Sequence, residues 1–400
     1  MYAALKGIRV VEVATWTFVP AAGAVLADWG ADVVKVEHPA TGDPQRGLVV
    51  GGLTPEQAAT VMIGHPNRGK RSVGLDISRP EGRDVLRRLV VGADVFLTNY
   101  LPAARRKLQV DLDDLREVNP RLVYVRGSGQ GVRGPDAERG GFDLASAWSR
   151  AGIGYKLTDP AYTEPVRQPP AFVDLAGGLA LAGGIAAALF ERERTGVAPV
   201  VDVSLFGVGS WMMAPDILGG SHLGGSLPLR SRTDANNPLV NAFPTKDGRW
   251  LNLVLLQSDR YWPELCAHLG RRDLVDDPRF ADARARHAHR SECVAELDAI
   301  FRTRTLDEWC DALATMEGVW APLRAPGEVP ADPQAIANGV LADVGSGPER
   351  VVASPVQFDE RPLGTVPAAP GLGADTDEVL GELGIDGDEL LSLKLADVVS

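Results

Sequence analysis

The sequence predicts a doubly wound α/β domain with a parallel sheet, together with a smaller α+β domain. Strand and helix patterns alternate over the first 130 residues, and that alternation is typical of a parallel sheet covered on both faces. The 400 residues exceed the roughly 250 to 300 that a single hydrophobic core usually serves. Beyond about Asn241 the alternation ends, and a turn between two strand-like runs is followed mainly by helical patterns.

The first strand is expected at residues 8–14 (IRVVEVA), a largely apolar run that is typical of a buried strand. Ser78-Arg79-Pro80-Glu81 predicts a capping box with proline in the first turn of a helix that ends near Val91. The other elements expected in this part of the chain are a helix at 21–29, strands at 32–37, 73–77 and 94–99, a helix at 112–118 and a strand at 122–126.

A helix is expected at 175–194, uncharged as far as Phe190, and a strand that runs into a helix at 200–206. The glycine-rich and serine-rich residues 219–226 indicate a linker or a mobile loop that could act as a lid. The turn Asp247-Gly248 and a second capping box, Thr305 to Glu308, belong to the smaller domain, and a helical tail at 375–399 is expected to dock on a core. The predicted division is therefore 1–205 with 330–400 as the large domain, 206–230 as the linker and 231–329 as the small domain.

Composition excludes several classes of function. The net charge of −12 argues against a nucleic-acid or anionic-membrane surface. Residues 1–20 lack a secretory signal pattern, and the uncharged run 175–190 is too short to span a bilayer, so we expect a cytoplasmic protein with a buried helix there. Three widely spaced cysteines fit a reducing compartment and provide no metal-binding pattern, and no metal site is predicted.

Asp174 is the strongest candidate for chemistry, because it stands where the long uncharged helix begins. It could be only an N-cap, which contributes about 1 kcal/mol to helix stability. The same position would also place backbone N–H groups beside any oxyanion that forms at this carboxylate.

Ligands of doubly wound sheets bind beyond the carboxyl ends of the strands. The loop after the first strand, residues 15–23, has no G-x-G-x-x-G pattern and carries Trp16 and Phe18, which disfavours a dinucleotide-dependent dehydrogenase. These two side chains suit an organic ligand, although they could equally be core residues beneath the loop. Asn99, Tyr100 and the basic residues 105–107 form a plausible nucleotide pocket, although the basic residues alone could be a solvated face.

Several motifs in fixed order resemble the class III coenzyme A transferase family, which includes formyl-CoA and carnitine CoA-transferases and α-methylacyl-CoA racemases. The resemblance covers essentially the whole chain. Its motifs are residues 5–12 (LKGIRVVE), 26–37 (LADWGADVVKVE), 67–72 (NRGKRS), 119–124 (NPRLVY), 173–174 with the glycine-rich helix, 245–248 (TKDG) and 375–380 (DTDEVL).

The resemblance implies that Asp174 is a covalent nucleophile, which passes through an aspartyl anhydride and an aspartyl-CoA thioester. It implies acyl-CoA and a free carboxylic acid as substrates, no cofactor beyond coenzyme A, and an interlocked homodimer with a Rossmann-like large domain. His38 stands where some members have Arg, and Ser78 where Lys is frequent, so Arg79 could replace the latter contact. The residues implied to bind coenzyme A are Thr15, Trp16, Thr17, Phe18, His38, Leu75, Arg79, Asn99, Tyr100, Lys107 and Leu108.

Two other functions stay open. A 2-methylacyl-CoA racemase is disfavoured because Phe142 stands where the racemases that this chain resembles carry a proton-transferring His, and Gln257 aligns with their Glu; phenylalanine cannot accept a proton. A CoA-binding protein without catalysis is the other alternative. The acids exchanged are not predicted beyond a preference for a bulky or apolar acyl group from Trp16 and Phe18.

Overall fold

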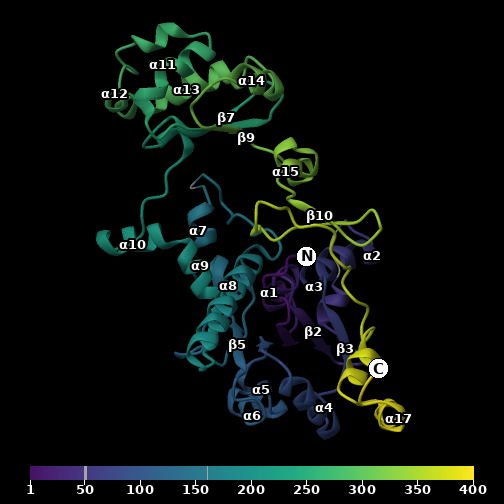
Figure 1. Ribbon diagram of the computed structural model, residues 1–400. Coiled ribbons are helices and arrows are strands. Elements are labelled where there is room, and N and C mark those ends of the chain that lie inside the picture. The colour runs from purple at the N-terminus through teal and green to yellow at the C-terminus, as the bar shows by residue number, and fades with distance from the viewer. Residues whose placement is uncertain (49–51, 160) are drawn as a thin grey trace. The chain divides into compact units, whose positions relative to one another are not determined.

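The computed structural model describes residues 1–48, 52–159 and 161–400. The chain forms two compact units, drawn in Figure 1. The first contains Met1–Tyr155, Val166–Gly224 and Pro333–Ser400, and the second contains Lys156–Pro165 and Gly225–Asp332.

The first unit is built on a six-stranded parallel sheet in the order β3-β2-β1-β4-β5-β6. Its central strand β1 pairs with β2 on one side and with β4 on the other, so the chain reverses its winding direction between β1 and β4. The doubly wound prediction is confirmed. The strands are β1 Arg9–Val13, β2 Asp32–Glu37, β3 Arg71–Gly74, β4 Val95–Thr98, β5 Val123–Ser128 and β6 Val200–Ser204.

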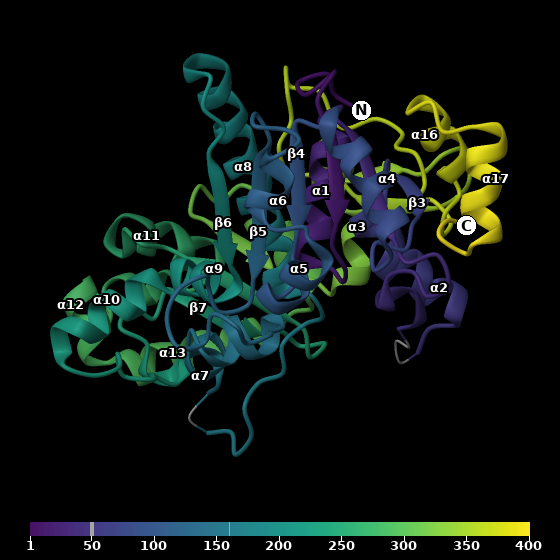
Figure 2. The ribbon, with the colours of Figure 1, turned by 90° about the horizontal axis from the view of Figure 1, so that it is seen from below.

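Alternating side chains of these strands enter two different cores. Val10 and Val123 pack with α1 (Phe18–Asp28) and α8 (Phe172–Thr195) on one face. Val11 and Tyr124 pack on the other face with α4 (Pro80–Val91) and the end of the chain. Figure 2 shows α16 and α17 beside the β3 edge of this sheet.

The other helices of this unit are α2 Pro55–Ala59, α3 His65–Asn67, α5 Pro102–Leu108, α6 Leu112–Arg116, α9 Leu205–Met212, α10 Ala214–Leu223, α15 Pro333–Ala337, α16 Thr376–Glu382 and α17 Gly387–Leu395, with α7 Ile153–Leu157 at the unit boundary. A two-stranded sheet pairs β10 Leu341–Asp343 with β11 Arg350–Val352.

Glycines allow α8 to lie directly against α1. A Cβ atom on Gly177 would lie 2.5 Å from Cε2 of Phe18, and one on Gly178 would lie 2.7 Å from the Cβ of Ala21. α8 is long and apolar enough to cross a membrane by length and composition. Its buried residues, among them Leu181 and Ile185, are instead part of the core beneath the sheet.

The C-terminal tail docks on the sheet, as predicted. The Asp375 carboxylate accepts a hydrogen bond from the Ser72 N–H at 2.7 Å, and the Thr376 hydroxyl accepts one from the Gly74 N–H at 3.0 Å. Val379 and Leu380 are buried in the core on that face.

Several local predictions need correction. The segment 219–226, predicted to be a loop, is helical through Leu223, where α10 ends before the left-handed Gly224. α1 begins at Phe18, three residues before the predicted start, and β3 ends at Gly74 rather than Ile77. The predicted capping box at Ser78 is wrong: Arg79 is the N-cap of α4, and no side chain caps it.

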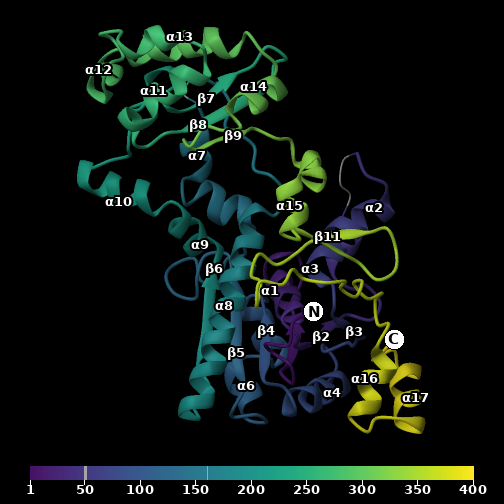
Figure 3. The same cartoon turned by 45° about the horizontal axis from the view of Figure 1, so that its top comes forward.

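The second unit has a three-stranded antiparallel sheet, β7 Val240–Pro244, β8 Trp250–Val254 and β9 Trp320–Pro322. Figure 3 shows its helices α11 Ser258–His268, α12 Ala283–Ala288, α13 Arg290–Phe301 and α14 Leu306–Leu313 around these strands. The predicted capping box at Thr305 and Glu308 is confirmed, and the predicted turn at Gly248 (φ 77°) joins β7 to β8.

Candidate active site

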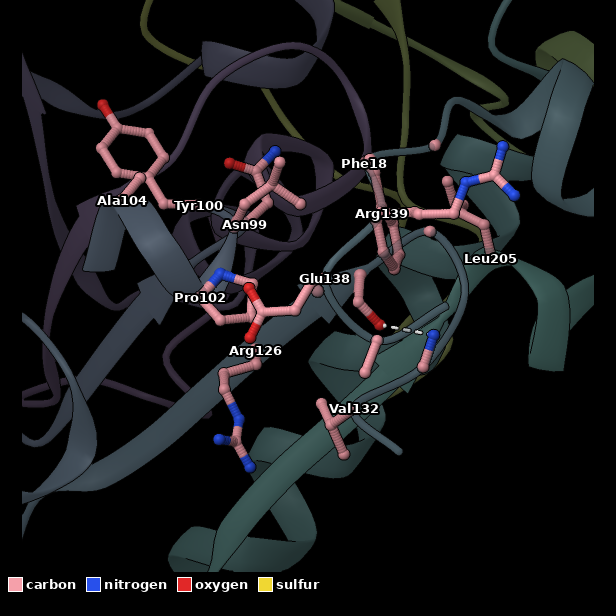
Figure 4. Close-up of a pocket in the computed structure, with 18 of the residues that line it drawn as sticks. Phe18, Asn99, Tyr100, Pro102, Ala104, Arg126, Val132, Glu138, Arg139 and Leu205 are labelled. Carbon is pink, nitrogen blue, oxygen red and sulfur yellow. Dashed lines mark hydrogen bonds between the residues drawn. The ribbon is translucent and has the colours of Figure 1, made fainter. Parts of the chain in front are cut away.

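A cavity of about 820 Å³ lies at the carboxyl ends of β1, β4 and β5 in the first unit. Figure 4 shows lining residues from the loop after β4 (Asn99, Tyr100), from the chain after β5 (Val132, Glu138, Arg139) and from the start of α9 (Leu205). A doubly wound sheet offers its ligand crevice at this edge, where the strand order reverses.

The reversal point is bridged by one side chain. Asn99 follows β4, and its Oδ1 accepts a hydrogen bond from the Thr15 N–H at 3.1 Å. Its Nδ2 donates to the Thr15 carbonyl oxygen at 2.6 Å. Both groups of the amide are therefore used to fix the loop that follows β1 on the floor of the cavity.

The next residue of that loop, Trp16, has a left-handed backbone with φ of 67°. This conformation is unfavourable for a residue other than glycine, so its surroundings must stabilise it. The Trp16 N–H donates to Oδ1 of Asp43 at 3.1 Å. Asp43 is buried and forms an ion pair of 3.0 Å with Lys35.

Lys35 belongs to a larger buried group of charges beneath the loop. Its ammonium lies 3.1 Å from Glu12, and Glu12 also pairs with Lys70 at 2.7 Å. Burial, opposed by the charge of Glu12, lowers the pKa of Lys70 to about 8. Because the partners come from β1, β2 and the approach to β3, these contacts tie three strands to the Trp16 loop.

Asp174 lies in the first turn of α8 and lines the cavity. Its carboxylate has no hydrogen bond or ion pair within the ranges that the structure describes. Burial, and secondly the charge of Asp143, raise its pKa to about 7.

The N-cap interpretation of Asp174 is wrong. α8 begins at Phe172, and its N-cap is the left-handed Ala171, which has no capping side chain. Asp143, which is 7% exposed, supplies the missing acceptor: the Val173 N–H donates to its Oδ2 at 3.2 Å. Asp174 therefore lies in the first turn, with its carboxylate free for another role.

The walls beside Asp174 are largely apolar. The rings of Trp16 and Phe142 meet edge to face with centroids 5.3 Å apart, and Phe142 is 58% exposed. Phe18, Ala145 and Leu205 also line the cavity.

Each arginine in the described lining has a carboxylate partner. Arg105 pairs with Asp111 at 2.7 Å, and Arg126 pairs with Asp202 at 2.6 Å. Two further pairs, each at 3.3 Å, join Arg106 to Glu138 and Arg139 to Asp136. An anionic ligand would have to compete with these carboxylates for the guanidinium groups.

The structure brings six of the predicted site residues to this cavity: Thr15, Trp16, Phe18, Asn99, Tyr100 and Asp174. The other six lie outside its lining. Thr17 is buried against Gln45, and Leu75 is in the core on the far face of the sheet. His38, Arg79 and Lys107 are on the surface, and Leu108 packs against the core on the far face of the sheet.

Sequence reasoning missed Asp43, Asp143 and the chain between β5 and Phe142. The glycine-rich residues 127–131 follow a predicted strand, so the rule on carboxyl ends could have identified them. Asp43 and Asp143 carried no comparable signal, because each acts on a backbone N–H group about thirty residues away in the chain.

Comparison with known proteins defines the class. The family model described as CoA-transferase family III matches residues 5–376, and the chain belongs to that family. It is a class III CoA-transferase, with an α/β fold like that of its relatives. This chain is 31% identical, over 99% of both chains, to an (R)-2-hydroxy-4-methylpentanoate CoA-transferase of Clostridioides difficile.

Two further relatives are informative. A succinate–glutarate CoA-transferase of Agrobacterium fabrum is 32% identical, with 95% of each chain covered. The crystal structure of a CAIB/BAIF family protein from Brucella suis superimposes with a TM-score of 0.83 at 30% identity, covering 96% of this chain and 100% of that one. Since the two named enzymes act on different acids, the family alone leaves the acids of this protein unassigned.

Proposed function

We propose that this protein transfers coenzyme A from an acyl-CoA thioester to a free carboxylic acid, with Asp174 as the covalent nucleophile. The observation that carries the proposal is the half-buried, unpartnered carboxylate of Asp174 at the cavity on the strand-reversal edge. A carboxylate is a weak nucleophile in water, and partial desolvation strengthens its attack on an activated acyl group.

The proposed reaction has two halves. The Asp174 carboxylate attacks the thioester carbonyl, and the C–S bond breaks to give a mixed anhydride and CoA thiolate. The thiolate then attacks the Asp174 carbonyl carbon of the anhydride, which releases the donor acid and leaves an aspartyl-CoA thioester. The acceptor carboxylate repeats these steps in reverse, and Asp174 leaves as a carboxylate when the thiolate takes the new acyl group.

The pKa of Asp174, about 7, connects this mechanism to pH. Only the ionised carboxylate can attack, so about half of the enzyme would be competent at pH 7 before substrate binds. N–H groups in the first turn of α8 other than that of Val173, which donates to Asp143, are the candidate donors to the tetrahedral oxyanions.

Coenzyme A is proposed to lie across the carboxyl edge of the sheet. Thr15, Trp16, Phe18, Asn99 and Tyr100 would contact the part that enters the cavity. Thr17 would act through its hydrogen bond to Gln45, which helps to hold the loop. His38, Leu75, Arg79, Lys107 and Leu108 would contact the nucleotide outside the cavity, through backbone groups where their side chains are buried.

The apolar walls formed by Trp16, Phe18 and Phe142 favour a donor acid with an apolar side chain. A dicarboxylate would need a cation for its second charge, and the arginines of the described lining are already paired. A screen of aromatic, branched aliphatic and dicarboxylic acyl-CoA donors tests this preference.

We also propose a cytoplasmic homodimer. α9 and α10 expose apolar side chains, with Trp211 83%, Leu218 63% and Leu223 64% exposed, and a second copy would cover them. Sedimentation velocity measures the oligomeric state directly, and a monomer at micromolar concentration would refute this part of the proposal.

Exchange of a radiolabelled acid into its acyl-CoA tests the function. Replacement of Asp174 by Asn or Ala should abolish exchange and leave CoA binding within about tenfold of the wild type. Exchange that survives both replacements would refute Asp174 as the nucleophile. Incubation of a 2-methylacyl-CoA in deuterated water separates the racemase alternative, because deuterium at C2 would support a racemase and no label is expected here.

A further inference from the structure

The start of α8 is capped from another part of the chain. The first N–H groups of a helix have no partner within it. Leu175 N–H donates to the Ala171 carbonyl oxygen at 3.1 Å, and the N–H groups before it need other acceptors. The Val173 N–H finds one in Oδ2 of Asp143, 3.2 Å away. Gln168 donates from its side-chain amide to the same oxygen.

Three observations separate this contact from an ordinary surface cap. Asp143 is buried, so the hydrogen bond is shielded from water. It stands 30 residues before Val173, so it joins two segments that the helix itself does not connect. It also directly follows Phe142, whose ring packs on Trp16 at the cavity wall. The residues on either side of this hydrogen bond, Phe142 and Asp174, therefore both line the cavity.

We propose that Asp143 is a positioning residue for the transfer reaction: by accepting the Val173 N–H, it fixes the first turn of α8 and so the direction of the Asp174 carboxylate. The inference rests on the proposed nucleophilic role of Asp174. A misplacement of a reacting group by about 1 Å can cost on the order of a hundredfold in rate, so a contact one residue from the nucleophile is expected to affect turnover more than binding.

The negative charge of Asp143 also disfavours the ionisation of Asp174. This charge raises the pKa of Asp174, second to burial. The other charged groups that face the cavity are Arg105 and Arg106 from α5, Arg126 from β5, and Glu138 and Arg139 from the chain after β5. Each of those arginines is paired with a carboxylate. Tyr100 is the remaining titratable side chain of the lining, and burial raises its pKa further above neutrality.

Two variants of Asp143 distinguish the effect of its hydrogen bond from the effect of its charge. Asp143→Asn keeps an oxygen that can accept the Val173 N–H and removes the negative charge. Asp143→Ala removes both. Gln168→Ala is the matched control, because it removes the second donor to Asp143 and leaves the cap on α8 intact.

The test measures kcat and KM for CoA exchange against pH, with circular dichroism to verify folding. For Asp143→Asn, the acidic limb of the kcat profile should move down by about half a pH unit to one unit, with the plateau within about threefold of the wild type. Asp143→Ala should lose about thirtyfold or more in kcat with KM for acyl-CoA nearly unchanged. Gln168→Ala should stay within about threefold in both parameters.

A fully active Asp143→Ala would overturn the positioning role, and an Asp143→Asn whose acidic limb stays in place would refute the effect of the Asp143 charge on Asp174. If Asp143→Ala does not fold, Asp143→Ser, whose shorter side chain withdraws the acceptor from the Val173 N–H, decides the positioning role by the same loss in kcat. The outcome also distinguishes this inference from the proposed function. Exchange that persists in Asp174→Ala refutes the function itself, whereas an inactive Asp174→Ala combined with unaffected Asp143 variants refutes only the positioning role.

Discussion

Replacement of Asp174 by Asn should stabilise the protein at alkaline pH while it removes activity. Burial and Asp143 raise the pKa of this carboxyl from its usual value of 3.8 to about 7. Between those values the folded protein keeps a proton that the unfolded chain releases. Stability is therefore lost as pH rises through this window, and the loss is complete above pH 7. An amide of the same shape does not titrate and avoids this loss.

The magnitude follows from the two pKa values. At about 1.4 kcal/mol for each pH unit, the whole rise corresponds to about 4 kcal/mol. Most of it is expressed above pH 5, and partial exposure of Asp174 to solvent reduces it. We therefore expect the free energy of unfolding of Asp174→Asn, relative to the wild type, to increase by about 2 kcal/mol between pH 5 and pH 8.

Urea denaturation of both proteins at several pH values between 5 and 8 measures this difference. Asp136→Asn is the control, because hydrogen bonds from Arg150 and Arg139 lower the pKa of Asp136, so its loss should give no gain at alkaline pH. Parallel stability curves for the wild type and Asp174→Asn would show that the carboxyl ionises freely in the folded protein, and the reasoning about its burial would be refuted.

Three further predictions concern other parts of the first unit. Gly177→Ala places a Cβ atom 2.5 Å from the Phe18 ring and should cost about 1 to 3 kcal/mol in thermal unfolding and raise KM for acyl-CoA. Gly183→Ala on the same helix meets nothing within 4 Å and should stabilise by about 0.5 to 1 kcal/mol; equal effects of the two would contradict the packing argument. Asp43→Ala removes one carboxylate partner of the buried Lys35 and should lower the free energy of unfolding, measured in urea, by about 3 kcal/mol. An unchanged denaturation midpoint would show that this ion pair does not stabilise the fold. Burial lowers the pKa of His65 to about 4, so the stability that is present above pH 6.5 is lost as the pH falls toward 4. His65→Gln should reduce this loss of unfolding free energy by at most about 3 kcal/mol. Identical acid unfolding of the variant and the wild type would refute the pKa shift.

The sequence was sufficient to predict the sheet and the edge that carries the site. Strand runs such as residues 95–97 are apolar on both faces, and the residues that follow β1 and β4 therefore had to meet at one edge. Thr15, Asn99 and Tyr100 lie there as expected. The beginning of α8 was also close to its true place, because charge stops abruptly at Asp174.

The predicted ends of helices and strands are wrong where apolar residues are buried without taking part in the hydrogen bonds of that element. Leu75 and Ile77 are buried, so they extended the predicted strand, yet the ladder of β3 ends at Gly74. Gly219 and Gly220 suggested a loop, but tertiary packing overrides a low helix propensity, and Gly220 is buried within α10.

The contacts around Asp174 could not be predicted from the sequence for a different reason. Asp43 stabilises the left-handed Trp16, and Asp143 caps the helix that carries Asp174. Both are single carboxylates in irregular segments, and their roles depend on long-range geometry that local patterns do not encode.

The most direct test of the central claim is mass spectrometry of the enzyme trapped with hydroxylamine during exchange. The wild-type protein incubated with acyl-CoA should carry a hydroxamate on the peptide that contains Asp174, because hydroxylamine attacks the aspartyl anhydride or thioester. The Asp174→Asn protein should carry none. An active wild-type enzyme with that peptide unmodified, or modified at another carboxylate, would contradict the account.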